Sequence, residues 1–459
     1  MNWASFMKRL LIANRGEIAL RIIRACRKLG LETVAIYSEA DANSPHVWAA
    51  DQAVKIGLAA ASQSYLDPNT ILQVAQSLNC DALHPGYGFL SERADFAEAC
   101  TAQKINFVGP SSEAITMMGD KSEARRTAKR LGVPVVPGSG DAFDDAGLAI
   151  DAASEVGYPI LLKALAGGGG RGMRVAPDAS SFPSLFTQAS REALAAFGNG
   201  NVYLERFIPA VRHIEVQVFG DKYGNVTHLW ERDCSVQRRH QKLIEEGPSP
   251  VLDARKRRDI CAAATKLAAG IGYVGAGTVE FIYDSATKEF YFIEMNTRIQ
   301  VEHPVTEMLT GIDLVAEQLR VASGERLSFV QDDVKASGHA IEFRINAEDP
   351  EHGFVPSPGT LTKWNPPKFP GVRFDSHVYR GYSVPRHYDS LLGKLIVHGS
   401  DRPDAIARSI RALDCFEVEG LATTIPFHRK LLTNSDFIES SVHTRWVETE
   451  FIHGQKQAN

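Results

Sequence analysis

The chain has 459 residues and a formal net charge of -5, from 50 basic and 55 acidic side chains, which gives no support for general nucleic-acid binding. Its hydrophobic content of 44% and charged content of 23% are typical of a globular protein with ample core, and the length predicts two to four domains. No apolar run reaches the length of a membrane-spanning helix, and the six cysteines show no metal-binding spacing, so we expect a cytoplasmic protein with reduced thiols.

Predicted strands and helices alternate over residues 8–131. Apolar runs predict strands at 8–13, 33–37, 82–84 and 106–109. Helical periodicity predicts helices at 17–29, 69–78 and 92–104, and a further helix that begins at Ser111. Such alternation favours a parallel sheet with helices on both faces. Ligands of these sheets lie beyond the carboxyl ends of the strands, so residues 14–17 and 85–91 are either candidate contacts or simple tight turns.

A glycine-rich segment follows a predicted domain boundary at residues 132–138. Gly167, Gly169 and Gly172 satisfy GxGxxG, yet residues 173–176 continue as a strand instead of opening a helix, which argues against the dinucleotide-binding motif. A glycine run between two strands predicts a flexible flap whose free N–H groups can surround phosphate oxygens. Lys163 on the entering strand can reach the same phosphates, although a plain flexible hairpin would have the same pattern.

The later part of the chain contains more strands and one dense polar segment. Residues 231–246 combine a basic cluster with adjacent acidic side chains, which argues against a nucleic-acid patch. Asp253 is predicted to cap a helix that runs to Ala269 and stops at Gly270. Residues 338–398 are rich in predicted strands, and a helix is predicted at 402–413.

Residues 277–302 predict a hairpin with one polar face. Read with a period of two, the second strand places five polar side chains on one side: Glu294, Asn296, Arg298, Gln300 and Glu302. A turn near Ala286 would place Glu280 opposite Phe292, with Glu294 as its diagonal neighbour. Glu280, Glu294 and Asn296 would then present hard oxygens to one point, which suits Mg²⁺ shared with nucleotide phosphates. The alternative is the solvated face of an amphipathic strand.

Four segments are distinctive: His84-Pro-Gly-Tyr-Gly-Phe-Leu-Ser-Glu92, the glycine loop, residues 231–242, and Glu294-Met-Asn-Thr-Arg-Ile-Gln-Val-Glu-His-Pro-Val-Thr-Glu307. Together they resemble the biotin carboxylase members of the ATP-grasp superfamily, and the resemblance runs from Arg9 to His428. It implies an α/β fold, α+β overall. The implied parts are an N-terminal Rossmann-like parallel-sheet domain at 1–109, a helical linker at 110–134, a small glycine-loop lid at 135–207, and a C-terminal mixed-sheet domain at 208–459.

The resemblance also implies a reaction. ATP and bicarbonate form carboxyphosphate with Mg²⁺ or Mn²⁺, carboxyphosphate gives CO₂ and phosphate, and biotin on a biotin carboxyl carrier protein is carboxylated at N1′. Because the sequence has no Met-Lys-Met attachment motif and no carboxyltransferase region, it is similar to a free-standing subunit of a multi-subunit acetyl-CoA carboxylase. Carboxyltransferase subunits and a second copy of the chain are the further expected partners, with no nucleic acid and no membrane.

The family motifs assign roles to individual residues of this sequence. For ATP they imply Lys121, Lys163, Gly169 and Gly170 at the phosphates, Glu205, Arg206, Phe207 and Ile208 at the adenine, and His213, Gln237 and His240 at the ribose. Glu280 and Glu294 are implied as ATP contacts and, with Asn296, as metal ligands. The bicarbonate pocket is implied to be Lys242, Arg298 and Val301, and the catalytic residues are Lys242, Arg298, Glu302 and Arg344.

Two of these roles explain the residue types. Bicarbonate must lose a proton to become a good nucleophile, so the implied role of Glu302 is that of the base. Arg298 beside it would favour the ionised carboxylate and hold the anion in a bidentate manner. Arg344 is implied to bind biotin and to stabilise its enolate. A lid that excludes water would protect carboxyphosphate.

The sequence departs from the family pattern at a few positions. Ala166 stands where a further glycine is usual, and Arg206 replaces a frequent lysine at a place where the backbone makes the contact. Ser383 and Arg386 alter the pattern that precedes Tyr-Asp-Ser, which bears on the parent complex rather than on the chemistry. Cys234 is given no role, and residues 1–6 form an extension or reflect the choice of start site.

Three alternatives remain open at this point. The parent complex could carboxylate another acyl-CoA or pyruvate. Another ATP-grasp ligase that activates a carboxylate, such as a carbamoyl-phosphate type of enzyme, would share much of the site. A non-catalytic nucleotide-binding subunit is the third, although such a protein is expected to lose its metal carboxylates or its base, and all of them are present.

Overall fold

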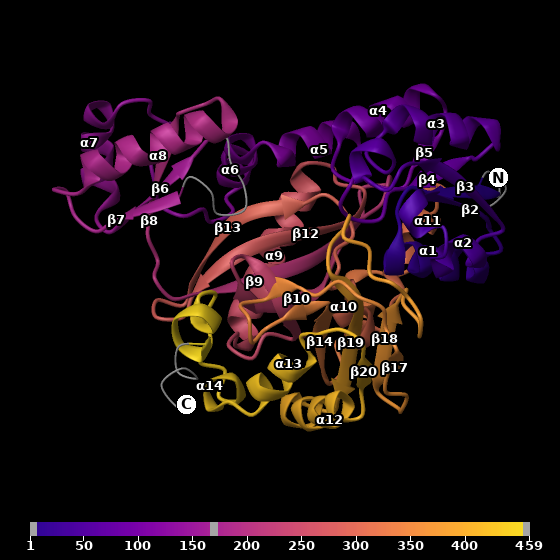
Figure 1. Ribbon diagram of the computed structural model, residues 1–459. Helices are drawn as coiled ribbons and strands as arrows, with labels where there is room; N and C mark the ends of the chain where they lie inside the picture. Colours follow the sequence, from indigo (N-terminus) through magenta and orange to yellow (C-terminus); the bar gives the residue numbers. More distant parts are fainter. Residues whose placement is uncertain (1–6, 166–172, 453–459) are drawn as a thin grey trace.

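The computed structural model describes residues 7–165 and 173–452 (Figure 1). The predicted flap at 166–172 lies outside these residues, and with it Ala166, Gly169 and Gly170. No helix within the described ranges has the length and apolar character needed to cross a bilayer.

The N-terminal part is a parallel sheet of five strands in the order β3-β2-β1-β4-β5. Its strands are β1 (Arg9–Ile12), β2 (Glu32–Ser38), β3 (Gln52–Gly57), β4 (Ala82–His84) and β5 (Asn106–Phe107), and its helices are α1 (Gly16–Leu29), α2 (Pro45–Ala49), α3 (Pro68–Ser77) and α4 (Ala94–Ala102). The predicted alternation is confirmed, and Gly30 in the left-handed conformation ends α1. The sequence patterns did not predict α2 and β3, because α2 is short and β3 lacks a continuous apolar run.

A small three-stranded unit stands to one side of the molecule (Figure 1). It is antiparallel in the order β7-β6-β8, with β6 (Ile160–Ala164), β7 (Met173–Ala176) and β8 (Val202–Arg206). Helices α7 (Ala146–Val156) and α8 (Phe182–Phe197) cover it, and α5 (Ser112–Gly119) and α6 (Lys121–Arg130) precede it in the chain. The unit has its own apolar core, in which Phe182, Phe186 and Leu204 are fully buried.

The centre of the molecule is an eight-stranded sheet in which all neighbouring strands are antiparallel. In spatial order its strands are β13 (Glu289–Asn296), β12 (Gly275–Asp284), β9 (Val211–Gly220), β10 (Val226–Arg238), β11 (Gln241–Gly247), β14 (His339–Asn346), β19 (Leu391–Gly399) and β18 (Val372–Ser376). An isolated parallel bridge joins Val135 to Phe292 at the edge of this sheet. The dense polar segment at 231–246 therefore forms two central strands.

Helices and two small sheets surround the central sheet. The helices are α9 (Ala254–Gly270), α10 (His303–Thr310), α11 (Leu314–Ala322), α12 (Arg402–Asp414), α13 (Ile425–Leu432) and α14 (Ser435–Ile438). The small sheets pair β15 (Glu348–Asp349) with β16 (Val355–Pro356), and β17 (Lys363–Asn365) with β20 (Glu417–Glu419). Asp253 caps α9 as predicted, but Gly270 is the last residue of that helix rather than its stop.

The hairpin of β12 and β13 is confirmed, but its register differs from the prediction. Glu280 lies opposite Glu294, and Phe292 lies opposite Phe281. The connection is one residue longer than expected, and an irregularity between Glu280 and Phe281 shifts the pairing by one more residue. Such a bulge has no clear sequence signal. It places the two carboxylates directly across from each other instead of diagonally.

The predicted polar face continues as a strand only to Asn296. Residues 297–302 leave the sheet before α10 begins, because the chain turns toward Glu92 of the N-terminal part. The Thr297 N–H donates to Glu92 Oε1 at 3.1 Å, and Arg298 Nε donates to Glu92 Oε2 at 2.9 Å. Thr297, Gln300 and Glu302 are buried and Arg298 is partly buried, so the alternative of a solvated strand face is wrong.

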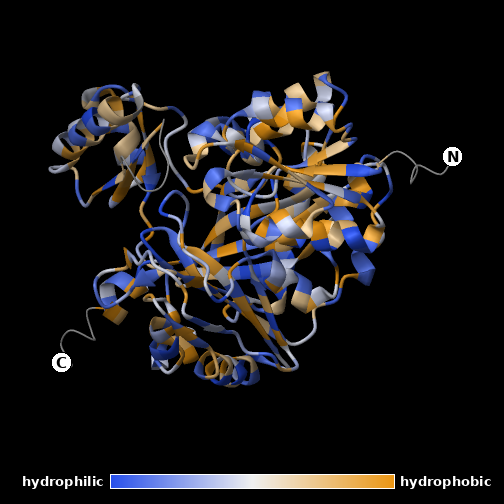
Figure 2. Cartoon of the chain, turned by 45° about the vertical axis from the view of Figure 1, so that its right-hand side comes forward, coloured by the Kyte–Doolittle hydropathy of each residue, from blue (hydrophilic) through white to orange (hydrophobic). Residues whose placement is uncertain are grey.

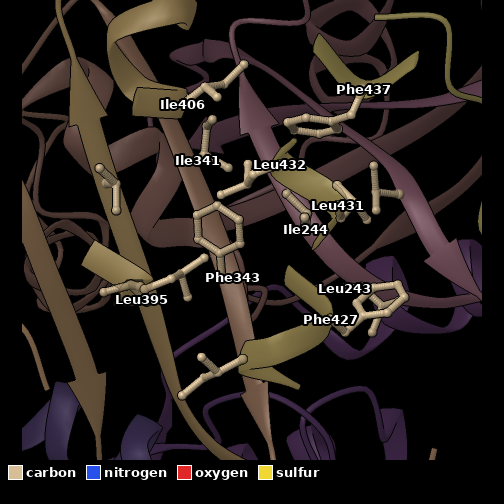
Figure 3. Close-up of a cluster of buried hydrophobic side chains, with 14 of the residues drawn as sticks. Leu243, Ile244, Ile341, Phe343, Leu395, Ile406, Phe427, Leu431, Leu432 and Phe437 are labelled. Atoms are coloured by element: carbon tan, nitrogen blue, oxygen red, sulfur yellow. The ribbon is translucent and has the colours of Figure 1, made fainter. Parts of the chain in front are cut away.

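Hydrophobic residues follow the strands through the interior of the molecule (Figure 2). The cluster in Figure 3 joins the β11, β14 and β19 strands to the C-terminal helices, and Ile341, Phe343, Leu395, Leu431 and Phe437 are buried in it. Because side chains alternate along a strand, Phe343 lies on the opposite face of β14 from Glu342 and Arg344. One face of the sheet thus carries the core, and the other carries charged groups.

We expect Phe343→Ala to lower the free energy of unfolding by about 3–5 kcal/mol, because it leaves a cavity in a fully buried cluster. Urea unfolding followed by tryptophan fluorescence measures the change. Val355→Ala, at a side chain that is 51% exposed, is the control and should have little effect. Equal stabilities for the two variants would contradict the placement of this core.

Candidate active site

A cleft of about 1120 Å³ lies between the small three-stranded unit and the charged face of the central sheet. Every predicted site residue that the structure describes lines it: Lys121, Lys163, Glu205, Arg206, Phe207, Ile208, His213, Gln237, His240, Lys242, Glu280, Glu294, Asn296, Arg298, Val301, Glu302 and Arg344. Tyr87, from the predicted contact loop 85–91, lines it as well. The structure thus brings together residues from four separate regions of the chain.

The predicted metal ligands meet on the hairpin of β12 and β13. Asn296 Nδ2 donates to Glu280 Oε1 at 2.7 Å, and His213 Nε2 lies 3.0 Å from Glu280 Oε2. Burial and the adjacent charge of Glu280 raise the pKa of Glu294. The pKa of Glu280 is lowered by Lys242 and His213, whereas a hard cation would favour the ionised form of the facing Glu294, so the two carboxylates fit a magnesium site.

A second grouping of possible metal ligands was not predicted. His213, Glu215 and Glu280 bring one ligand atom each within 4.8 Å of one another. Glu215 is fully buried, and Lys242 and Arg232 compensate its charge. Because these cations already hold it, Glu215 is better suited to orienting Lys242 than to binding a metal.

Lys242 and Arg344 hold Glu302 between them. Lys242 Nζ donates to Glu302 Oε1 and also to Glu215 Oε2 at 2.6 Å and Glu280 Oε1 at 3.3 Å. Arg344 Nη2 donates to Glu302 Oε2 at 3.0 Å. Burial alone would raise the pKa of Glu302, but the charges of Lys242 and Arg344 lower this pKa below its usual range. Glu302 is therefore an ionised, buried carboxylate at neutral pH, as a proton acceptor must be.

Arg298 does not pair with Glu302, which corrects the expected neighbour. Its side chain donates to Glu92 Oε2, to Asn296 Oδ1 at 2.9 Å and to the Ile299 carbonyl. The sequence placed Arg298 and Glu302 on one strand face, but the chain leaves the sheet between them. The ionised state of Glu302 comes instead from Lys242 and Arg344, which belong to β11 and β14.

The opposite wall of the cleft carries the predicted adenine and phosphate contacts. Lys163 Nζ lies 2.5 Å from Glu205 Oε2, and Arg125 Nη1 lies 2.6 Å from Glu205 Oε1. Arg206 Nη2 donates to the Tyr291 hydroxyl at 2.7 Å. Residues of the small unit thus reach the central sheet, and Glu205 links the two cations that flank the cleft.

The turn between β10 and β11 is backbone-strained. Arg239 and His240 have φ values of 49° and 62°, and the flanking Arg238 and Gln241 are paired. Two-residue hairpins of this kind favour Asn-Gly, whereas non-glycine residues in the left-handed region are destabilising. The turn presents His240 and Gln241 to the cleft, which is a functional reason for keeping side chains there.

Sequence analysis missed the buried groups that support the site. Arg232, fully buried, donates to Glu215 Oε1 at 2.7 Å, to Thr306 Oγ1 at 2.8 Å and to Gln300 Oε1. Gln300 in turn donates to Glu280 Oε1 at 3.0 Å. The period of two that places His213 on the cleft face also places Glu215 there, so that signal was available. No sequence signal identified the partners of Arg232, because they come from distant parts of the chain and are known only from the fold.

Two further carboxylates lie behind Arg344. Arg344 Nε donates to Glu245 Oε1 at 2.6 Å, and Glu245 lies opposite Glu342 on the neighbouring strand. Burial raises the pKa of Glu245 to about 7, and it raises the pKa of Glu342 well above its usual value. Neither oxygen of Glu342 has a hydrogen-bond partner among the described residues. Burial thus favours the neutral form of Glu342, and Arg344 lies between the carboxylates of Glu245 and Glu302, to both of which it donates.

Three family models match the chain. They are described as "Biotin carboxylase, N-terminal domain" over residues 6–115, "Carbamoyl-phosphate synthase L chain, ATP binding domain" over 120–330, and "Biotin carboxylase C-terminal domain" over 342–449. Together they account for most of its length.

Known proteins resemble the whole chain. Biotin carboxylase 1 of Bacillus subtilis is 54% identical over 448 residues, which cover 98% of this chain and 100% of that protein. A crystal structure of a Campylobacter jejuni biotin carboxylase–β,γ-ATP complex is 48% identical, with a TM-score of 0.93 and coverage of 97% and 99%.

A third relative is the biotin carboxylase domain dimer of Hydrogenobacter thermophilus 2-oxoglutarate carboxylase, solved with MgADP, ADP and bicarbonate. It is 47% identical, with a TM-score of 0.91 and coverage of 97% and 98%. These matches confirm the expected ATP-grasp fold. The chain belongs to the biotin carboxylase family.

Proposed function

We propose that this protein is the biotin carboxylase subunit of a multi-subunit acetyl-CoA carboxylase. It uses ATP, Mg²⁺ or Mn²⁺, and bicarbonate to carboxylate biotin on a biotin carboxyl carrier protein. The observation that carries the proposal is the buried Glu302 between Lys242 and Arg344, beside the paired Glu280 and Glu294. Such an array supplies a base, an anion pocket and a metal site within one cleft.

ATP binds along the wall formed by the small unit, which acts as a lid. Lys121 and Lys163, with Gly169 and Gly170 of the flap, are proposed to contact the phosphates, and residues 205–208 the adenine. His213, Gln237 and His240 are proposed at the ribose. The support is that all of the described members line a single cleft. If the ion pair between Glu205 and Lys163 breaks, Lys163 becomes free to contact a phosphate oxygen.

Glu280 and Glu294, with Asn296, would hold the metal ion next to the ATP phosphates. When bound, the ion supplies positive charge that stabilises the phosphate oxygens during transfer. The protein's own contribution is to fix two facing carboxylates with a short network, in which Gln300 and Asn296 both donate to Glu280 Oε1.

Bicarbonate is proposed to bind between Lys242, Arg298 and Val301. Glu302 accepts its proton, and the resulting oxygen attacks the γ-phosphorus of ATP to give carboxyphosphate and ADP. Carboxyphosphate then breaks down to CO₂ and phosphate. Biotin N1′ gives its proton to the released phosphate and attacks CO₂, and Arg344 stabilises negative charge on the ureido oxygen.

The parent complex is proposed from the named relatives of the family. Relatives in the family include both free-standing biotin carboxylases and a domain of a 2-oxoglutarate carboxylase. We favour acetyl-CoA carboxylase, a homodimer, and a cytoplasmic setting, the last because all six cysteines are unbridged. Co-purification from the native cell, followed by identification of the carrier and carboxyltransferase, tests the assignment. A pyruvate-specific carboxyltransferase in the complex would overturn it.

We expect Glu294→Gln to lose most metal-dependent ATP turnover, because it removes a hard anionic ligand while keeping the size of the side chain. The measurement is ATP hydrolysis against Mg²⁺ concentration at saturating bicarbonate. Glu289→Gln, at the exposed start of the same strand, is the matched control. Normal turnover in a folded Glu294→Gln protein would contradict the metal assignment.

The roles of Glu302 and Arg344 predict different defects. Glu302→Gln should abolish both bicarbonate-dependent ATP cleavage and biotin carboxylation, with a loss of about 10²–10⁴-fold. Arg344→Gln should retain some ATP cleavage and lose carboxybiotin by about 10²–10³-fold, because its charge is needed only after carboxyphosphate exists. Both variants need thermal melts that match the parent. Loss of the two activities in the same ratio in both variants would make this division of roles wrong.

The same arginine predicts a shift in pH dependence. Because Arg344 helps to lower the pKa of Glu302, Arg344→Gln should raise that pKa toward its ordinary value. The base works only when ionised, so the acid limb of bicarbonate-dependent ATP hydrolysis should move to higher pH. Arg402→Gln is the control, since Arg402 pairs with the buried Glu246 outside the cleft. An unmoved acid limb would show that Arg344 does not set this pKa.

A further inference from the structure

Lys394 is a buried lysine that contacts the site without lining the cleft. It lies on β19 with no exposed surface, opposite Arg344 of β14 and Asp375 of β18 in the sheet. Its Nζ donates to the Val301 carbonyl at 2.7 Å and lies 3.0 Å from Glu17 Oε1. A buried ion pair of this kind is often no more stabilising than an apolar pair of the same size, so its presence calls for a role beyond stability.

The carbonyl that Lys394 holds belongs to an irregular segment. Residues 297–301 connect β13 to α10 outside sheet and helix, and Glu302 is the N-cap residue of α10. Among the residues that the structure describes, Lys394 is the one side chain that donates to the Val301 carbonyl. Because a peptide unit is planar, fixing this oxygen also fixes the N–H and the Cα of Glu302. The direction in which the Glu302 side chain leaves the chain therefore depends on Lys394.

Glu17 brings the N-terminal part into the same contact. It lies in the first turn of α1 and is 4% exposed, and the Tyr87 hydroxyl donates to the oxygen that faces Lys394. Its other oxygen has no hydrogen-bond partner among the described residues. One carboxylate oxygen thus ties together α1, the 85–91 loop and, through Lys394, the segment that carries Val301 and Glu302.

We infer that Lys394 and Glu17 form a positioning pair, which sets the Val301–Glu302 peptide so that the bicarbonate pocket and its base are correctly placed. Neither residue lines the cleft, so neither touches substrate. The inference rests on the proposed function. It predicts an effect on bicarbonate and not on nucleotide, because the ATP wall of the cleft is formed by other elements.

The test is the double variant Glu17→Gln with Lys394→Met, which removes both charges and keeps both volumes. We expect kcat/KM for bicarbonate to fall by roughly 10²-fold, the usual scale for a misplaced reacting group. The affinity for MgATP should stay unchanged, and amide hydrogen exchange at 297–303 should become faster. The control is Arg257→Met with Glu231→Gln, an ion pair joined at 2.7 Å in which Glu231 is buried and Arg257 is partly exposed, and whose members do not line the cleft.

Three outcomes would overturn the inference: unchanged bicarbonate kinetics in a folded double variant, equal losses for bicarbonate and MgATP, or the same bicarbonate defect in the control. If the double variant does not fold, Glu17→Gln alone serves, because it removes the negative charge that holds Lys394 and leaves a neutral, weaker acceptor in its place. It should raise the KM for bicarbonate and leave MgATP affinity unchanged, and normal bicarbonate kinetics in it would also overturn the inference. A parent protein without bicarbonate-dependent ATP cleavage would instead refute the proposed function.

Discussion

The dense set of buried charges on one face of the central sheet governs the rest of this structure. Lys242 contacts the carboxylates of Glu215, Glu280 and Glu302 at once. Arg232, which is fully buried, donates hydrogen bonds to Glu215 and Gln300. An ion taken out of water costs several kcal/mol unless its partners are well placed. The strands must therefore hold these side chains in register, and a rigid antiparallel sheet does so better than loops could.

Apolar packing on the other face of the same strands offsets the free-energy cost of burying these charges. Phe343 and its neighbours pack under the C-terminal helices, so β14 contributes core on one side and Glu342 and Arg344 on the other. The two functions alternate residue by residue along one strand. A change of register by a single residue would exchange them, which is why the pairing of β11, β14 and β19 is critical for both core and site.

Local sequence patterns predicted a large part of this molecule. Strand and helix alternation in the N-terminal part, the cap at Asp253 and the β12 and β13 hairpin with Glu280 and Glu294 on one face all depend on neighbouring residues, and all are present. The family motifs added contacts from distant regions, and every described member of that set lines the cleft.

The errors and omissions have a common physical cause. The bulge after Glu280 changed the register, and the departure of the chain at residue 297 separated Arg298 from Glu302. Both are decided by contacts with other strands and with Glu92, far away in the sequence. The support given by Arg232 was missed for the same reason, because a buried cation can be assigned a partner only when the fold is known.

The pairing of Glu17 with Lys394 also has a consequence for how the molecule is made. During synthesis, α1 leaves the ribosome long before β19. The carboxylate of Glu17 therefore has no Lys394 to pair with until most of the chain has been translated. Until then, closing α1 against the nascent centre would bury an uncompensated charge, which is strongly unfavourable. We therefore expect α1 to dock fully only after β19 has been made. A truncated chain that lacks β19 would keep this region open, where proteases and chaperones can recognise it, and would not become a folded protein with a defective site.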